Sequence, residues 1–311
     1  NILLHTCSAA LLWRLLRRWS VPGSAIAAVI FALHPVQVES VAWMSELKNT
    51  LSGVFYLLAA TAYVRFDETR DRRAYALALA AFMLSLGSNT VTATLPAALL
   101  IVLWWRRGRV EWRRDVAPLL PFFATGVAAG LGTAWLEYAW VGAQGSYFGL
   151  TFVERILLAG RAAWFYAGKI VWPVGLMFNY PRWVVSQAVW WQYLFPLALA
   201  AVLAGLLAIP TRTRAPLAAA LFFLCTLFPA LGFVNVYPFR YSFVADHFQY
   251  LACLGPIVAI ASGITLAARK WRPGLAETLI ALTIAAPLFV LTFLESRHYT
   301  GSDTLYPTTI A

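Results

Sequence analysis

A polar stretch with several titratable residues, His34-Pro35-Val36-Gln37-Val38-Glu39-Ser40, separates two apolar runs near the start of the chain. Pro35 disfavours helical geometry at His34, so the stretch is predicted to form an elbow between two helices. Glu39 is a candidate general base, or the group that orients one. His34 is a candidate to bind a hydroxyl or a phosphate.

A second polar stretch, Glu46-Leu47-Lys48-Asn49, follows this elbow. A purely structural elbow is the alternative to a functional one. A glutamate of the elbow would then cap the N-terminus of a helix. Lys48 would pair with Glu46 or extend its ammonium group toward the membrane surface.

Cations and aromatic residues are interspersed between Glu154 and Trp183. Arg161 and Lys169 are predicted to bind a lipid phosphate, because fixed cations beside apolar residues suit that group and arginine grips phosphate with two hydrogen bonds. The alternative is a set of interfacial cations with aromatic anchors, which is the preferred interpretation for Arg182.

Asp246 and His247 lie together where another apolar run is predicted to begin. An acid beside an imidazole can serve acid–base chemistry. Asp246 can equally cap the helix, since aspartate is favoured at that position. One histidine and one aspartate are too few ligands for a metal ion, so no metal site is predicted.

The elements that position these residues are predicted to be membrane-spanning helices. Of 311 residues, 61% are hydrophobic and 12% are charged, whereas soluble domains carry about 25% charged residues. Apolar runs near the ~20 residues that span a bilayer recur along the whole chain. The predicted class is an all-α polytopic membrane protein with about ten spans, at 1–16, 24–38, 48–65, 75–88, 92–106, 117–140, 192–210, 217–236, 248–268 and 277–295.

The net charge of +11 predicts topology and not a nucleic-acid partner, because the basic residues cluster between alternate spans. Cytoplasmic loops carry the excess of Lys and Arg, so these clusters are predicted to face the cytoplasm and both chain ends to face outward. The five clusters are Arg14, Arg17, Arg18; Arg65, Arg70, Arg72, Arg73; Arg106, Arg107, Arg109, Arg113, Arg114; Arg212, Arg214; and Arg269, Lys270, Arg272.

The segment 144–182 departs from this alternation, since both of its ends are predicted to lie outside. It is predicted to be a re-entrant or interfacial segment, with a pair of short crossings as the alternative.

Several motifs resemble the bacterial relatives of the transmembrane-and-tetratricopeptide-repeat O-mannosyltransferases. They occur in the family's order through essentially the whole chain, and the tail leads toward repeats as it does in that family. The motifs are His34–Trp43 with Glu46, Lys48-Asn49 and Leu51-Ser52; Thr94-Leu95-Pro96; Trp172-Pro173; Tyr180-Pro181; Ala245-Asp246; Tyr250-Leu251; and Gly301–Tyr306.

The resemblance implies a GT-C glycosyltransferase fold over 1–295 and, in 296–311, an outward tail leading to tetratricopeptide repeats. It also implies a bacterial inner membrane, with both ends in the periplasm. Such enzymes transfer a sugar from a polyprenyl-phosphate carrier on the outward face with inversion. A carboxylate in the first outward loop activates the acceptor and cations hold the phosphate.

This chain departs from the family in two respects. The family's first span and acidic outward loop precede the region that matches Asn1, so the usual catalytic acid is absent, and we expect a fragment that is inactive alone. Asn89-Thr90 stands where relatives carry Lys-Pro, and His247 stands where they carry Arg.

The resemblance and the polar clusters together predict transfer of a sugar, with mannose as the candidate, to a protein or glycan hydroxyl. Glu39 and Asp246 would have catalytic or orienting roles, while Arg161, Lys169 and Arg240 would bind carrier phosphate. The remaining pocket residues would be His34, Glu46, Lys48, Tyr180 and His247. The lipid-linked sugar is a substrate, and no cofactor is predicted.

The rival prediction is a non-catalytic subunit or scaffold of a larger membrane complex, in which the helices hold a place and the repeats bind partners. Both alternatives predict contact with membrane lipids and none with nucleic acid.

Overall fold

The computed structural model describes residues 1–208, 213–270, 275–301 and 305, and these contain helices and no strand. The all-α prediction is therefore confirmed for the described part of the chain. Arg212 and Arg272 of the basic clusters lie outside it, as does most of the tail, of which 296–301 and 305 are described.

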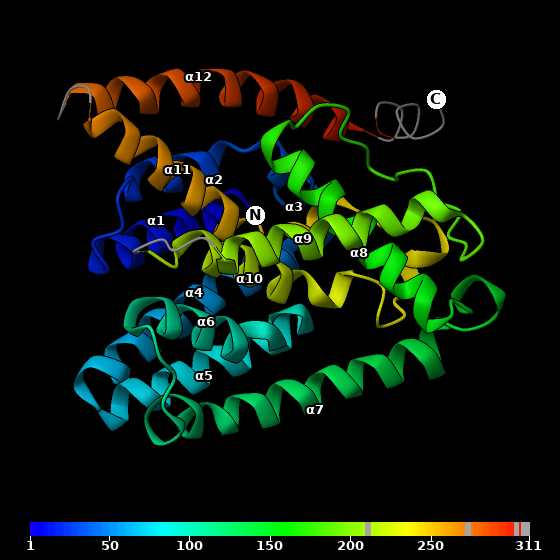
Figure 1. The fold of residues 1–311 in the computed structure, drawn as a ribbon, viewed down its shortest axis with the longest axis horizontal. Coiled ribbons are helices and arrows are strands. Elements are labelled where there is room, and N and C mark those ends of the chain that lie inside the picture. The colour runs from blue at the N-terminus through cyan, green and yellow to red at the C-terminus, as the bar shows by residue number, and fades with distance from the viewer. Residues whose placement is uncertain (209–212, 271–274, 302–304, 306–311) are drawn as a thin grey trace.

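Twelve α-helices are found among the described residues, and short 3-10 turns join several of them (Figure 1). The helices are α1 (Ile2–Arg18), α2 (Ser24–Leu33), α3 (Val38–Ala42), α4 (Leu47–Thr69), α5 (Arg72–Ser88), α6 (Leu95–Arg107), α7 (Leu120–Leu136), α8 (Phe152–Val171), α9 (Leu194–Ala208), α10 (Ala215–Leu227), α11 (Leu254–Arg269) and α12 (Leu275–Ser296).

Three helical stretches of the described chain are long and apolar enough to cross a membrane: Trp112–Val141, Trp190–Ala208 and Leu279–Thr300. A fourth arises if α2 and the helical residues Pro35–Ala42, which are bent by 55°, form one broken span. The lengths and composition support a helical membrane protein. The ten predicted spans and the GT-C fold stay predictions.

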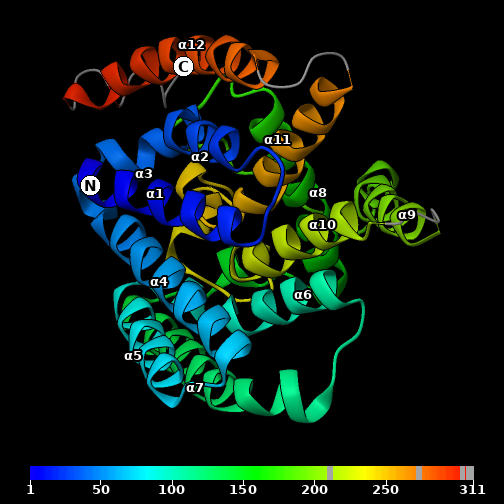
Figure 2. The ribbon, with the colours of Figure 1, turned by 90° about the vertical axis from the view of Figure 1, so that its left-hand side faces the viewer.

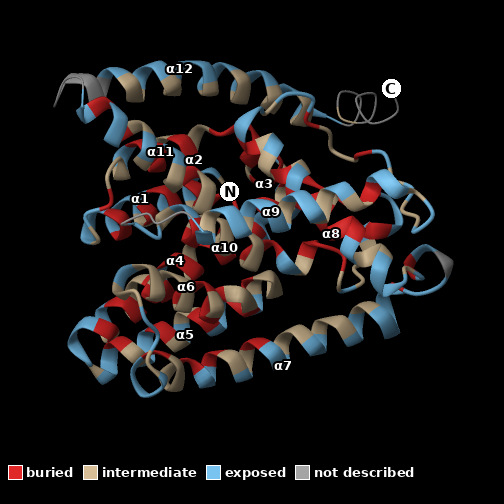
Figure 3. Ribbon diagram, viewed as in Figure 1, coloured by how far each residue is buried: buried red, intermediate tan, exposed pale blue. Residues whose placement is uncertain are grey.

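The outer faces of α7, α9 and α12 carry large apolar side chains in exposed positions (Figure 3). Soluble monomers rarely expose contiguous apolar surface of this kind, whereas hydrocarbon tails cover it without cost. Examples are Leu131 (67% exposed), Trp135 (60%), Leu197 (63%), Phe289 (58%) and Phe293 (57%).

The basic ends of α1, α6 and α11 lie together on the left of Figure 1, where α5 begins. The loop between α8 and α9 and the end of α12 lie on the right. We call the two ends of the molecule the basic side and, after its predicted orientation, the outward side. The basic ends of these helices therefore gather at one end of the described chain, and which side of a membrane each end faces stays a prediction.

The helices pack in two halves, and α8 packs closely against α9. In both views α4, α5, α6 and α7 form one half of the molecule, and α1, α2, α11 and α12 form the other (Figure 2). Gly160 allows α8 to approach α9 closely, because a Cβ there would lie 2.5 Å from the backbone nitrogen of Pro196.

The segment 144–182 contains α8, a 20-residue amphipathic helix that buries Leu157, Leu158 and Tyr166. It begins at a capping box in which Thr151 and Glu154 satisfy each other's backbone N–H groups. Helix α8 is not among the stretches that are long and apolar enough to cross a membrane. Its re-entrant or interfacial placement stays a prediction.

Candidate functional site

Pro35 sets the backbone geometry of the polar elbow. His34 has extended geometry (φ −77°, ψ 128°), which confirms the predicted break, and Pro35 then begins a 3-10 turn that leads into α3. This bend turns Glu39 inward, where it is 3% exposed. A second turn, Met44–Glu46, precedes α4 and buries Glu46.

Glu39 and His247 meet although 208 residues separate them. The imidazole Nδ1 of His247 lies 2.8 Å from Oε1 of Glu39, and the backbone N–H of His247 donates to Oε2 at 2.8 Å. Glu39 thereby accepts a backbone N–H of the 3-10 turn Asp246–Gln249, whose N-cap residue is Ala245. The contact between His247 Nδ1 and Glu39 Oε1 is an ion-pair distance, since neither of these buried atoms makes a hydrogen bond with the described residues.

Glu46 closes the other side of the imidazole. Its Oε1 lies 4.0 Å from Nε2 of His247 and 3.1 Å from Nζ of Lys48, so the predicted Lys48–Glu46 pair is present. Asn49 donates to Glu46 Oε2 at 2.6 Å and to the carbonyl of His247 at 3.2 Å. Asn89 in turn donates to Asn49 Oδ1 at 2.6 Å.

Asp246 faces Tyr180, whose hydroxyl lies 2.9 and 3.1 Å from the two carboxylate oxygens. The capping role proposed for Asp246 is wrong, because Ala245 occupies the N-cap position and the Asp246 carboxylate is engaged by Tyr180. Tyr166 accepts the backbone N–H of Ala245 at 3.1 Å, which anchors this turn to α8. We call Glu39, Glu46, Asp246 and His247 the Glu39 cluster.

Charge and burial shift two pKa values within the Glu39 cluster. Burial raises the pKa of the Asp246 carboxyl well above its ordinary value, and the negative charge of Glu39 raises it further. Burial disfavours the charged imidazole of His247, but Glu39 and Glu46 outweigh this effect and raise the pKa of His247. The cluster therefore contains groups suited to proton exchange.

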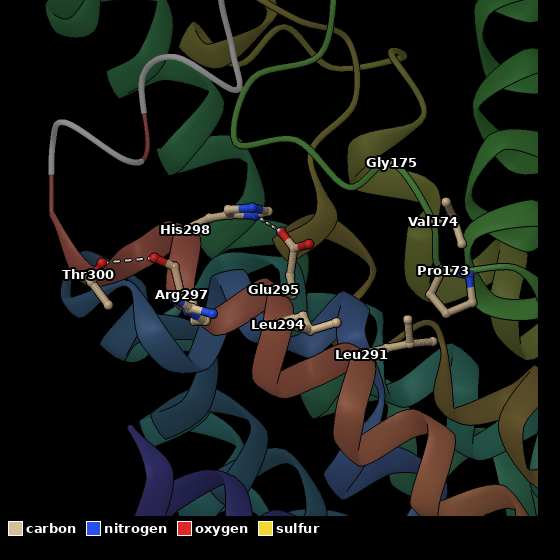
Figure 4. A pocket seen from close by; sticks show the side chains of 9 residues that line it. All are labelled: Pro173, Val174, Gly175, Leu291, Leu294, Glu295, Arg297, His298 and Thr300. Carbon is tan, nitrogen blue, oxygen red and sulfur yellow. Dashed lines mark hydrogen bonds and ion pairs between the residues drawn. The ribbon is translucent and has the colours of Figure 1, made fainter.

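A cavity of about 650 Å³ lies between α12 and the chain that follows α8 (Figure 4). Glu295 lines it and lies within electrostatic range of Asp246. Lys169 donates to the carbonyls of Val174 and Gly175 at 2.7 and 2.8 Å, and both of these residues line the cavity. Arg297 and His298 line the same cavity.

The three predicted phosphate-binding cations share no contact. Arg161 lies over the ring of Trp183, 4.2 Å from its centroid, and Arg240 lies over Tyr147 at 5.6 Å. Lys169 alone is tied to the cavity and to Tyr180, whose ring centroid lies 5.3 Å from its ammonium group. The predicted trio is therefore not one binding site in this structure.

The side chain of His34 also has structural contacts. Its Nε2 lies 2.9 Å from the carbonyl of Ile170, and its Nδ1 accepts the backbone N–H of Val36 at 3.4 Å. Both ring nitrogens are occupied, so His34 joins the elbow to the end of α8 and has no nitrogen left for a phosphate.

Sequence reasoning missed the contribution of α12. The motifs described in the sequence analysis do not include Glu295, Arg297 or His298, all of which line the cavity. His298 Nδ1 lies 3.4 Å from Glu295 Oε1, which places this pair at the cavity wall (Figure 4). The i, i+3 spacing of a carboxylate and an imidazole was the available signal.

The described residues form helices without strands, include three stretches long and apolar enough to cross a membrane, and hold a buried carboxylate–imidazole pair at one end. No protein-family model, no curated protein and no solved structure matches this chain. Within the described residues, no group of three or more His, Cys, Asp and Glu side chains is arranged to hold a metal ion.

Proposed function

We propose that this chain is the membrane module of a glycosyltransferase in a bacterial inner membrane. It would transfer a sugar, with mannose as the first candidate, from a polyprenyl-phosphate carrier to a protein or glycan hydroxyl on the outward side. The observation that carries the proposal is the 2.8 Å contact between His247 Nδ1 and Glu39 Oε1.

The geometry favours His247 as the base and Glu39 as the group that orients it. A carboxylate on one ring nitrogen fixes the tautomer and leaves the other nitrogen to exchange a proton. His247 Nε2 makes no hydrogen bond with the described residues and faces Glu46 at 4.0 Å. Glu39 therefore takes the orienting role, one of its two predicted roles.

The reaction requires one proton transfer and one displacement. His247 Nε2 removes the proton of the acceptor hydroxyl, and the hydroxyl oxygen attacks C1 of the sugar. The bond from C1 to the phosphate oxygen breaks, and the carrier phosphate leaves with the electron pair. Arg297 lines the cavity and Lys169 binds two carbonyls of its wall, and these two cations would stabilise the charge that develops on this phosphate.

The test uses the intact protein in detergent, polyprenyl phosphate mannose as donor and a serine- and threonine-containing peptide as acceptor. His247→Ala is expected to lower transfer by ~10²–10⁴-fold, the usual contribution of a general base. Donor binding, measured by native mass spectrometry, should change little. Glu111→Gln is the control variant and should leave transfer unchanged, because Glu111 lies at the basic side and its side chain is 44% exposed.

A non-catalytic scaffold is the second candidate, and one observation favours it. Arg161, Arg240 and His34 are all engaged in contacts that hold loops and helices together. A scaffold would bind no polyprenyl-phosphate sugar, and Lys169→Ala would leave its lipid content unchanged. Selective binding of the donor that Lys169→Ala abolishes would exclude this candidate.

A further inference from the structure

A second cavity shares no lining residue with the Glu39 cluster and reaches Trp19 and Trp105 at the basic side. It measures about 280 Å³, is open on one side, and is lined by α1, α4, α6, α10 and α11. Its wall is almost entirely apolar, and Leu12, Leu99, Val102, Phe222 and Val258 contribute to it. Figure 2 shows α1, α6, α10 and α11 around this region. A hydrocarbon chain matches such a wall, since it needs no hydrogen-bond partner.

The mouth of this cavity is aromatic and cationic. Trp19, which directly follows α1, and Trp105, near the end of α6, both line it. The guanidinium carbon of Arg106 lies 5.4 Å from the ring centroid of Trp19. Tryptophan is enriched at the level of lipid headgroups, and arginine there pairs with anionic groups.

One donor at this mouth is unused. The indole Nε1–H of Trp19 is buried and has no hydrogen-bond acceptor among the described residues. A buried donor without a partner is costly, so a bound acceptor would relieve that cost. A phosphate or ester oxygen of a lipid headgroup at the mouth would supply it.

Charge distinguishes an anionic from a zwitterionic lipid. Arg106 shares the carboxylate of Glu68 with Arg18, at 3.9 and 2.5 Å respectively, so one carboxylate faces two guanidinium groups. The basic end of α1 adds Arg17 to this side, whereas Arg107 of α6 is already paired with Asp67 and Asp115. The excess positive charge complements a phosphodiester that carries no compensating ammonium group.

We propose that this cavity binds an anionic phospholipid of the leaflet at the basic side. One acyl chain would enter the apolar cavity, and the headgroup would lie against Arg106 and the Trp19 indole N–H. The proposal rests on the membrane orientation inferred from the basic clusters and is independent of the proposed transfer reaction.

The test is native mass spectrometry of the purified protein titrated with dioleoyl phosphatidylglycerol or with dioleoyl phosphatidylcholine, which has the same chains. The protein is expected to retain the anionic lipid in preference. Trp19→Phe and Arg106→Gln should each weaken phosphatidylglycerol binding by roughly tenfold, because each removes a hydrogen bond or an ion pair to the headgroup. Arg109→Gln is the control, since Arg109 lies on the same side and its side chain is 79% exposed.

Trp19→Phe keeps an aromatic side chain and removes only the N–H donor and part of the ring system. It therefore remains a usable test if Arg106→Gln fails to fold. Ala98→Phe adds a ring to a residue of the cavity wall and should prevent binding of the acyl chain. Equal retention of both lipids would overturn the proposal. So would a preference for phosphatidylglycerol that persists in Trp19→Phe and in Ala98→Phe.

Discussion

Buried carboxylates occur at both ends of the molecule, but their partners differ. At the basic side Arg107 bonds to both Asp67 and Asp115, whose side chains are 5% and 0% exposed. We call these three residues the Arg107 cluster. At the outward side two equally buried carboxylates of the Glu39 cluster have other partners: Glu39 faces an imidazole and Asp246 faces a phenol.

The difference separates a fixed ion pair from an exchangeable one. A guanidinium group keeps its proton at all accessible pH values, so the Arg107 cluster is always paired and its role is to join α4, α6 and the chain that precedes α7. The imidazole of His247 can gain or lose a proton near neutral pH. The pair that it forms with Glu39 can therefore change its charge, whereas the Arg107 pairs cannot.

Removal of Arg107 should produce the largest effect. Arg107→Leu leaves Asp67 and Asp115 buried without their common partner, and breaking a buried pair in this way costs about 3–5 kcal/mol. The free energy of unfolding, measured by denaturant titration in detergent, should fall by that amount.

Arg109→Leu is the matched control for this substitution. Arg109 is a neighbouring arginine whose side chain is 79% exposed, and its loss should change stability by no more than about 0.5 kcal/mol. Equal effects for Arg107→Leu and Arg109→Leu would show that burial does not distinguish them.

The sequence predicted the basic clusters and the outward acids because charges between apolar runs are visible as a one-dimensional pattern. It did not predict that Arg107 bridges Asp67 and Asp115, which lie 40 and 8 residues away. It also left a cap as one of two roles for Asp246, because it could not show that Tyr180, 66 residues earlier, would engage the carboxylate. Pairings of this kind depend on helix packing, which a single sequence does not reveal.

Glu39 gives the corresponding test at the outward side. Glu39→Ala leaves the backbone N–H of His247 without its acceptor, and an unsatisfied buried donor costs about 1–3 kcal/mol. The loss should be smaller than for Arg107→Leu, because His247 can release its proton and leave no unpaired charge. Denaturant titration of both variants under one condition checks the order. A larger loss for Glu39→Ala would contradict the distinction between fixed and exchangeable pairs.

The two clusters should also differ in their response to pH. The pKa of His247 is raised in the folded state, so its stabilising contribution is complete below its unfolded value of 6.5 and is lost as the pH rises through the folded value. Because the pKa of Asp246 is also raised in the folded state, this group too makes the free energy of unfolding fall as the pH rises above its unfolded value of 3.8. Arg107 contributes no such slope.

Thermal unfolding in detergent from about pH 6 to about pH 9 measures this response. The midpoint should fall with rising pH in the wild type and fall less in His247→Asn. Asp246→Asn should remove the remaining part of the slope from the Glu39 cluster. A slope that is unchanged in the double variant would place its origin elsewhere in the chain.

The smallest effect is expected for an arginine that forms an ion pair without burial. Arg18 lies 2.5 Å from Glu68, but the two side chains are 40% and 34% exposed. Water and salt screen such a pair, so Arg18→Ala should cost only ~0.2–1 kcal/mol, and less at high ionic strength. Denaturant titrations at low and high sodium chloride measure both quantities.

The loss of unfolding free energy caused by Arg107→Leu should persist in high salt, because the partners of Arg107 are enclosed by protein. If salt reduced both losses to the same degree, exposure would not be what separates the two arginines, and the assignment of the Arg107 cluster as a buried, permanent ion pair would be wrong.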